Sequence, residues 1–65
     1  MNMQKLKGKI IEKKKNYEQC AKAINKSKQS FSDKINGKRK FYIDEANALG
    51  IFLNLSADEK ADIFL

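Results

Sequence analysis

The segment from Asn16 to Arg39, NYEQCAKAINKSKQSFSDKINGKR, determines the architecture that we predict for this chain of 65 residues. It contains two short stretches of helix-favouring sequence on either side of Asn25, and the Asn36-Gly37 pair follows the second. Two short helices joined by a tight turn form a helix-turn-helix unit. The segment therefore predicts this motif over about residues 16–39, with the rest of the chain supplying the helices that support it.

The first helix of the motif should begin near Tyr17. Asn16 is a favourable N-cap residue, and Gln19, three residues later, completes a capping box. Asn25 tolerates the left-handed backbone conformation that ends many helices, so the helix should stop there. The inward face of this helix should be narrow and should consist of Cys20, Ala21 and Ile24.

The second helix should span about residues 28–35. Ser27 is its expected N-cap, and Asn36-Gly37 should end it, because glycine adopts the left-handed conformation at little cost. Phe31 and Ile35 have the spacing of buried residues. A helix of this size is about 12 Å long, which is close to the width of the major groove of B-DNA.

The outward face of this second helix carries polar side chains of mixed hydrogen-bonding character, namely Lys28, Gln29, Ser32 and Asp33. Glutamine pairs bidentately with adenine and lysine donates to guanine, so this face suits the readout of base edges. For Asp33 the alternatives are acceptance from a cytosine amino group, exclusion of other bases, or simple solvation. Lys38 and Arg39 directly follow the helix and suit contacts with phosphate.

One helix should precede the motif. Residues 1–4 should be frayed, and a helix over about residues 5–14 should bury Leu6 and Ile10, which recur at helical spacing among lysines. Whether Ile11 joins this apolar stripe stays open. The lysine run at residues 13–15 suits the negative end of the helix macrodipole.

Two helices should follow the motif. Residues 41–53 are too apolar for a surface helix, so this segment should back the motif. Ser56 and Glu59 form a second capping box, which should start a helix that runs from about Ala57 to the end. The expected fold is therefore an all-α, compact bundle of about five short helices in a single domain over residues 1–65.

Charge is unevenly distributed along the chain, whose net charge is +6. Residues 1–41 carry 13 of the 14 basic residues and three acids, a balance of +10, whereas residues 42–65 carry one lysine and five acids, a balance of −4. This division favours one face for a polyanion and another for packing or a protein partner. The alternative is a lysine-rich surface that only keeps the domain in solution.

The composition excludes several other classes of function. The sequence has one cysteine and no histidine, which argues against a disulfide, a zinc site or any cofactor, and Cys20 should be a small buried hydrophobe. No nucleophile and base are paired and no glycine loop would hold a phosphate, so we do not expect an enzyme. No apolar run has the length of a membrane span or a signal peptide, which indicates a cytoplasmic protein.

The segment from Asn16 to Arg39 resembles the helix-turn-helix of phage repressors and Cro-type regulators. The matching features are the cap at Asn16 and Gln19, the inward Ala21 and Ile24, SKQSFS at residues 27–32 and NGKR at residues 36–39. The following segment, KFYIDEANALGIFLNLSADEKADIFL, is similar to small Cro-like proteins of Gram-positive prophages. The resemblance implies a lambda-repressor-like fold and a transcriptional regulator of phage lysis or lysogeny, associated with the nucleoid of a bacterial host.

The resemblance also implies roles for particular residues. The side chains that would contact base edges are Lys28, Gln29, Ser32 and Asp33. The side chains that would contact phosphate are Tyr17, Ser27, Ser30, Asn36, Lys38 and Arg39. This chain departs from the family pattern at Lys26 and Lys34, where apolar residues are usual, and this leaves the rotation of the second motif helix open.

The resemblance implies a homodimer on a double-stranded DNA operator, because half-sites lie about 34 Å apart and one short domain cannot span them. Two roles are open for the terminal residues Ile63, Phe64 and Leu65, namely the core of the domain or a dimer contact. The alternative function is a protein-interaction module that binds a partner repressor and modulates it through the acidic third and the apolar end of the chain.

Overall fold

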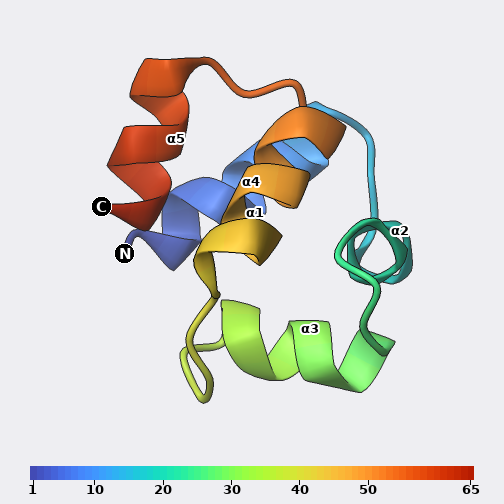
Figure 1. The fold of residues 1–65 in the computed structure, drawn as a ribbon. Coiled ribbons are helices and arrows are strands. Elements are labelled where there is room, and N and C mark those ends of the chain that lie inside the picture. The colour runs from blue at the N-terminus through green and yellow to red at the C-terminus, as the bar shows by residue number, and fades with distance from the viewer.

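The computed structural model describes residues 1–65 and contains five helices and no strand (Figure 1). The helices are α1 (Met3–Glu12), α2 (Tyr17–Ala23), α3 (Lys28–Ile35), α4 (Ile43–Phe52) and α5 (Ala57–Phe64). Helix α2 packs against α3 and α4, and α1 packs against α3 and α5. This arrangement confirms the predicted all-α bundle of five short helices. None of these helices is long and apolar enough to cross a lipid bilayer.

Local hydrogen bonds start the helices where the sequence predicted them. Asn16 Oδ1 accepts from the backbone N–H of Gln19 at 2.8 Å, and Gln19 Oε1 accepts from the backbone N–H of Asn16 at 2.9 Å. Ser27 Oγ likewise accepts from a backbone N–H of the first turn of α3, at 3.1 Å. Asn25 and Gly37, at φ 58° and φ 83°, take up the left-handed conformations after α2 and α3. The boundaries of α2 and α3 are therefore as predicted.

The beginning of the chain differs from the prediction. Helix α1 starts at Met3 rather than near Lys5, and Asn2 is its N-cap, with its side chain accepting from the backbone N–H of Lys5 at 3.1 Å. The backbone N–H of Asn2 donates to the carbonyl of Ile63 at 2.7 Å. This long-range bond holds the segment that we expected to fray. Ile11 is 76 % exposed, so it does not join the apolar stripe of α1.

The core combines residues from all five helices and the loop before α4. Its fully buried side chains are Leu6, Cys20, Phe31, Ile35, Leu49, Leu53 and Ile63. Four aromatic rings run through it as edge-to-face pairs, with centroid separations of 5.4 Å for Tyr17 and Phe31, 5.8 Å for Phe31 and Phe41, and 5.6 Å for Phe41 and Phe64. This row of rings fixes α3 against α2, the loop and the end of α5.

Helix α4 is less buried than its composition suggested. Leu49 and Ala46 face the core, but Ile43 and Ile51 are both 83 % exposed, so one side of this apolar helix is at the surface. Gly50 allows α5 to approach, because a Cβ atom at this position would lie 3.0 Å from Lys60 Cδ. The helix therefore backs the motif as expected while leaving apolar side chains uncovered.

Ion pairs join α1 to α5. Lys5 Nζ lies 2.7 Å from Asp62 Oδ2, and the Lys9 ammonium pairs with Glu59 and, at 3.3 Å, with Glu12. Hydrogen bonds from Lys9 and from the backbone of Ser56 lower the pKa of Glu59 to about 2. The charges of Glu59 and Asp62 in α5 are thus balanced by lysines of α1.

Candidate nucleic-acid interface

Helix α3 forms one edge of the molecule, on the side away from the two chain ends (Figure 1). Its inward face consists of Phe31, Lys34 and Ile35, all buried. The residues on its other side are exposed or partly exposed, namely Lys28, Gln29, Ser30, Ser32, Asp33 and Asn36. The structure thus brings the side chains that we assigned to base readout onto one accessible face of an eight-residue helix.

Asp33 organises the C-terminal half of this face. Its Oδ1 accepts a hydrogen bond from Gln29 Nε2 at 3.0 Å, and its Oδ2 lies 3.9 Å from Arg39 Nε. Its carbonyl oxygen accepts from the backbone N–H groups of Lys38 and Arg39 at 2.8 Å and 3.3 Å. Both carboxylate oxygens therefore have a partner within the chain, and each retains a lone pair that could still accept from a base.

The serines and asparagine near the face also have local partners. Ser27 Oγ caps α3, and Asn36 Nδ2 donates to Ser32 Oγ at 3.3 Å. A serine hydroxyl that accepts one hydrogen bond can still donate its own proton. Ser27 and Ser32 can therefore hold the helix and still donate outward to a phosphate or a base.

A basic hollow lies beside the first residue of α3. It is lined by three lysines and one acid together with polar and apolar side chains, namely Lys7, Ile10, Ile11, Lys15, Asn16, Tyr17, Glu18 and Lys28. The ring of Tyr17 packs edge-to-face on the buried Phe31, so the tyrosine is held in place while remaining partly exposed. Sequence reasoning missed Lys7 as a site residue, because nothing local in α1 distinguishes it from the other lysines of that helix. Lys15 lies after α1, in the lysine run at residues 13–15.

A second basic hollow lies on the opposite flank of α3. It is lined by Lys26, Ser30, Lys34, Arg39, Lys40 and Tyr42. Ser30 in this hollow and Lys28 in the first lie roughly 200° apart around the helix axis, so the two hollows flank the exposed face. A helix in a major groove lies between two phosphate backbones, and this arrangement provides cations on both sides.

Most of the basic residues have no carboxylate partner within the fold. The exceptions are Lys5, Lys9, Lys34 and Arg39. Lys28 and Lys38, at the two ends of α3, are both exposed and unpaired, and so is Lys26 in the turn. Exposed, unpaired cations retain their full attraction for a polyanion, which favours the α3 side as a nucleic-acid surface.

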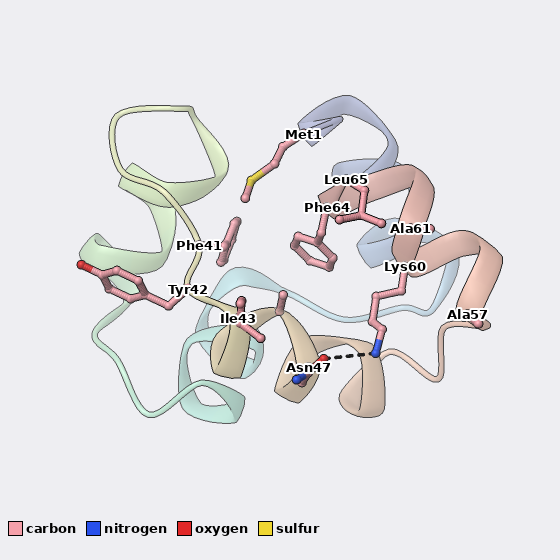
Figure 2. Close-up of a pocket in the computed structure, with 11 residues that line it drawn as sticks. Met1, Phe41, Tyr42, Ile43, Asn47, Ala57, Lys60, Ala61, Phe64 and Leu65 are labelled. Carbon is pink, nitrogen blue, oxygen red and sulfur yellow. Dashed lines mark hydrogen bonds between the residues drawn. The ribbon is translucent and has the colours of Figure 1, made fainter.

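An apolar hollow of about 300 Å³ lies between the start of α4 and the end of α5 (Figure 2). The edge-to-face pair of Phe41 and Phe64 lines it, and Met1 and Leu65 border it. Lys60 Nζ donates to Asn47 Oδ1 at 3.1 Å at one end of the hollow.

The three C-terminal apolar residues fall into two groups. Ile63 is fully buried and belongs to the core, so it cannot take part in a dimer contact, and our assignment of it to such a contact is wrong. Phe64 is partly buried and Leu65 is 93 % exposed. Of the three residues, only Phe64 and Leu65 are accessible for a contact with another protein.

No protein-family model, curated protein or solved structure matches this chain.

Proposed function

We propose that this protein is a sequence-specific DNA-binding transcriptional regulator of the repressor or Cro type, with α3 in the major groove of its operator. The observation that supports this most strongly is the exposed face of α3 between two basic hollows. Uncharged donors and acceptors in the middle suit base edges, and cations on both flanks suit the two phosphate backbones. Control of phage lysis or lysogeny is the biological role that we propose on the basis of the family resemblance.

The residues divide between two tasks in this proposal. Lys28, Gln29 and Ser32 contact base edges, and Asp33 holds Gln29 in position. Phosphate contacts fall to Tyr17, Ser27, Ser30, Asn36, Lys38 and Arg39, and we add Lys7, Lys15 and Lys26 from the two hollows. The phosphate contacts supply affinity that depends on salt, whereas the base contacts supply specificity.

We further propose that the protein binds a two-fold symmetric operator as a homodimer. One copy is at most 27 Å across, and half-sites of an operator lie about 34 Å apart, so the second half-site requires a second copy. The apolar hollow bordered by Phe64 and Leu65 is the surface that suits this contact. Four of the six large apolar or aromatic side chains that are exposed line it, namely Met1, Tyr42, Ile43 and Leu65.

Selection of bound sites from a pool of random duplexes tests the DNA-binding proposal directly. A consensus with two-fold symmetry is the expected outcome, and sedimentation equilibrium with the selected duplex should show two protein chains per duplex. Recovery of unrelated duplexes without a consensus would contradict specific binding. A consensus of one half-site with one chain bound would contradict the dimer but not the groove-binding role of α3.

A second candidate function is a protein-interaction module that binds a partner repressor. The apolar hollow and the nearby exposed Ile43 favour it, together with Asp44 and Asp58, two acids of the C-terminal third that have no cationic partner. Titration with duplexes at low salt separates the two functions. If no duplex binds and a purified phage repressor forms a complex that Leu65→Asp abolishes, the interaction module is the better description.

A further inference from the structure

Lys34 is a lysine on the inward face of the proposed DNA-reading helix. It lies between Phe31 and Ile35 in the buried set of α3, and it is only 5 % exposed. Burial of an ammonium group is costly unless the group is paired and hydrogen-bonded. Most lysines of this chain lie at exposed or partly exposed positions, so the burial of Lys34 requires a compensating interaction.

The Lys34 ammonium has three partners, and all of them lie beyond the end of α3. Its Nζ lies 3.0 Å from Glu45 Oε1 and 3.1 Å from the carbonyl oxygen of Lys40. It also lies over the ring of Tyr42, 4.8 Å from the centroid. Lys34 therefore connects the last turn of α3 to the loop over residues 38–42 and to the first turn of α4.

Glu45 shares one oxygen between two tasks. The side chain is 3 % exposed, and Oε1 accepts from the backbone N–H of Tyr42 at 2.9 Å as well as from Lys34. Its other oxygen, Oε2, is buried and has no hydrogen-bond partner. The oxygen that accepts the hydrogen bond at the start of α4 is thus the same oxygen that pairs with Lys34 of α3. Both helices therefore depend on Glu45 Oε1.

An apolar side chain at position 34 would tolerate small rotations of α3, because dispersion contacts have little directionality. The lysine stem is flexible and follows small rotations as well, but a larger rotation carries the ammonium away from its two acceptors, and hydrogen bonds weaken steeply when their geometry is lost. Rotation by one residue, roughly 100°, would leave Glu45 buried and unpaired. The Lys34 contacts therefore define one rotation of α3, and with it the direction in which Gln29 and Asp33 point.

We infer that Lys34 and Glu45 form a positioning pair that sets the rotation of α3 and holds the loop that carries the phosphate-contacting residues Lys38 and Arg39. The inference rests on the proposed DNA-binding function, which it deepens by adding a residue that determines specificity without contacting DNA. Lys34 departs from the apolar residue usual at this position, and its partner lies eleven residues further along the chain.

The double variant Lys34→Met/Glu45→Gln tests the inference at unchanged net charge. Methionine fills a similar volume, and glutamine retains an oxygen for the backbone N–H of Tyr42. Replacement of a buried ion pair by residues of similar volume is often neutral for stability, so the variant should fold. The matched control is Lys5→Met/Asp62→Asn, which makes the same change of charge in the exposed pair between α1 and α5.

Two readouts are needed. The first is amide hydrogen exchange at Lys38 and Arg39, which donate to the carbonyl of Asp33, and at Tyr42, which donates to Glu45. The second is the ratio of affinities for the selected duplex and a random duplex. We expect faster exchange at all three amides, because the loop loses Lys34 and a neutral amide oxygen is a weaker acceptor for Tyr42 than a carboxylate. The ratio should fall by about tenfold, since one base contact is worth about that factor. The control should alter neither readout.

Other outcomes would overturn the inference. A double variant that folds and retains the wild-type ratio of affinities for the selected and random duplexes would overturn it, whether or not the three amides exchange faster. If the double variant does not fold, the single variant Glu45→Gln is measured instead. A wild-type ratio of affinities in that variant would likewise overturn the inference. If the wild-type protein shows no preference among duplexes, the proposed function fails, and the exchange of the three amides alone decides whether the pair holds α3 and the loop.

Discussion

Gln29 and Asp33 are joined by a hydrogen bond across one turn of α3, with Nε2 of the amide 3.0 Å from Oδ1 of the carboxylate. A side-chain amide has two donors and an acceptor, so Gln29 retains one N–H and its carbonyl oxygen for a base. That pair of groups is what adenine requires in the major groove. The bond thus restrains a flexible side chain without consuming the groups needed for recognition.

Replacement of Asp33 should therefore separate affinity from specificity. Asp33→Ala removes a negative charge beside Arg39 and releases Gln29, so binding to random duplexes should strengthen while the preference for the selected site falls by about tenfold. Titration of both duplexes at one salt concentration measures the two effects. Asp44→Ala, which removes an exposed acid without a partner, is the matched control and should leave the preference intact. An unchanged preference in Asp33→Ala would show that Gln29 needs no restraint.

Truncation of Gln29 should affect only the selected duplex. Loss of a bidentate base contact costs about 1–3 kcal/mol, so Gln29→Ala should weaken binding to the selected site by about tenfold or more and leave binding to random DNA unchanged. Fluorescence anisotropy with the two duplexes gives both values. Gln4→Ala, an exposed glutamine on α1, should change neither. Equal losses on both duplexes would contradict the base-contact role.

Lys38 should behave as a phosphate contact. Lys38→Ala should weaken binding to all duplexes alike, and the slope of log affinity against log salt should become shallower by about 0.9, because one fewer counterion is released. The measurement is a salt series on both the selected and a random duplex. Lys5→Ala is the control, since Lys5 pairs with Asp62 on α5 and lines neither of the two basic hollows. A selective loss on the selected duplex would instead make Lys38 a base contact.

Glu59 should make stability depend on pH in the acid range. Its pKa is lowered to about 2, first by Lys9 and then by the backbone of Ser56, against an ordinary value of 4.5. A carboxyl group with a lowered pKa stabilises the folded state above pH 4.5, and this contribution is lost as the pH falls from about 4.5 to about 2. Urea unfolding of Glu59→Gln should show a smaller loss of stability over that interval than the wild type.

The control for this pH effect is Asp58→Asn, which changes a neighbouring acid that has no ion pair. It should retain the wild-type dependence on pH. An identical acid response in Glu59→Gln and the wild type would assign the loss of stability to other carboxyl groups.

Cys20 should react only when the domain opens. The thiol is fully buried, and burial raises its pKa to about 11, with Lys15 acting weakly in the opposite direction. Since the thiolate is the reactive form, labelling by a thiol reagent at pH 8 should be very slow and should accelerate in urea in parallel with the loss of helical circular dichroism. Rapid labelling of the folded protein would show that α2 moves away from the core.

The sequence predicted the local elements of the fold well. The capping boxes at Asn16 and Ser56, the cap at Ser27 and the left-handed Asn25 and Gly37 all depend on residues within a few positions of one another. Such contacts can be recognised from spacing alone. For the same reason the boundaries of α2 and α3 agreed with the prediction.

What the sequence did not predict depends on contacts between distant residues. The bond from Asn2 to Ile63, near the other end of the chain, holds the residues before α1, whereas the N-cap of Asn2 on Lys5 is local and was overlooked. The buried pair of Lys34 and Glu45 could not be anticipated, because charged residues are usually exposed. The exposed Ile43 and Ile51 were missed because α4 is apolar on most sides, so periodicity does not identify its outward face.

The two ends of the chain hold each other through the bond between Asn2 and Ile63 and through the ion pairs that Lys5 and Lys9 form with α5. In many small domains the terminal turns open independently and at little cost. Here, opening of the first turn of α1 would break the backbone bond to Ile63 and the ion pair with Asp62, both in the second half of α5. The terminal helices should consequently behave as one cooperative unit, and shortening the chain at one end should loosen the opposite end.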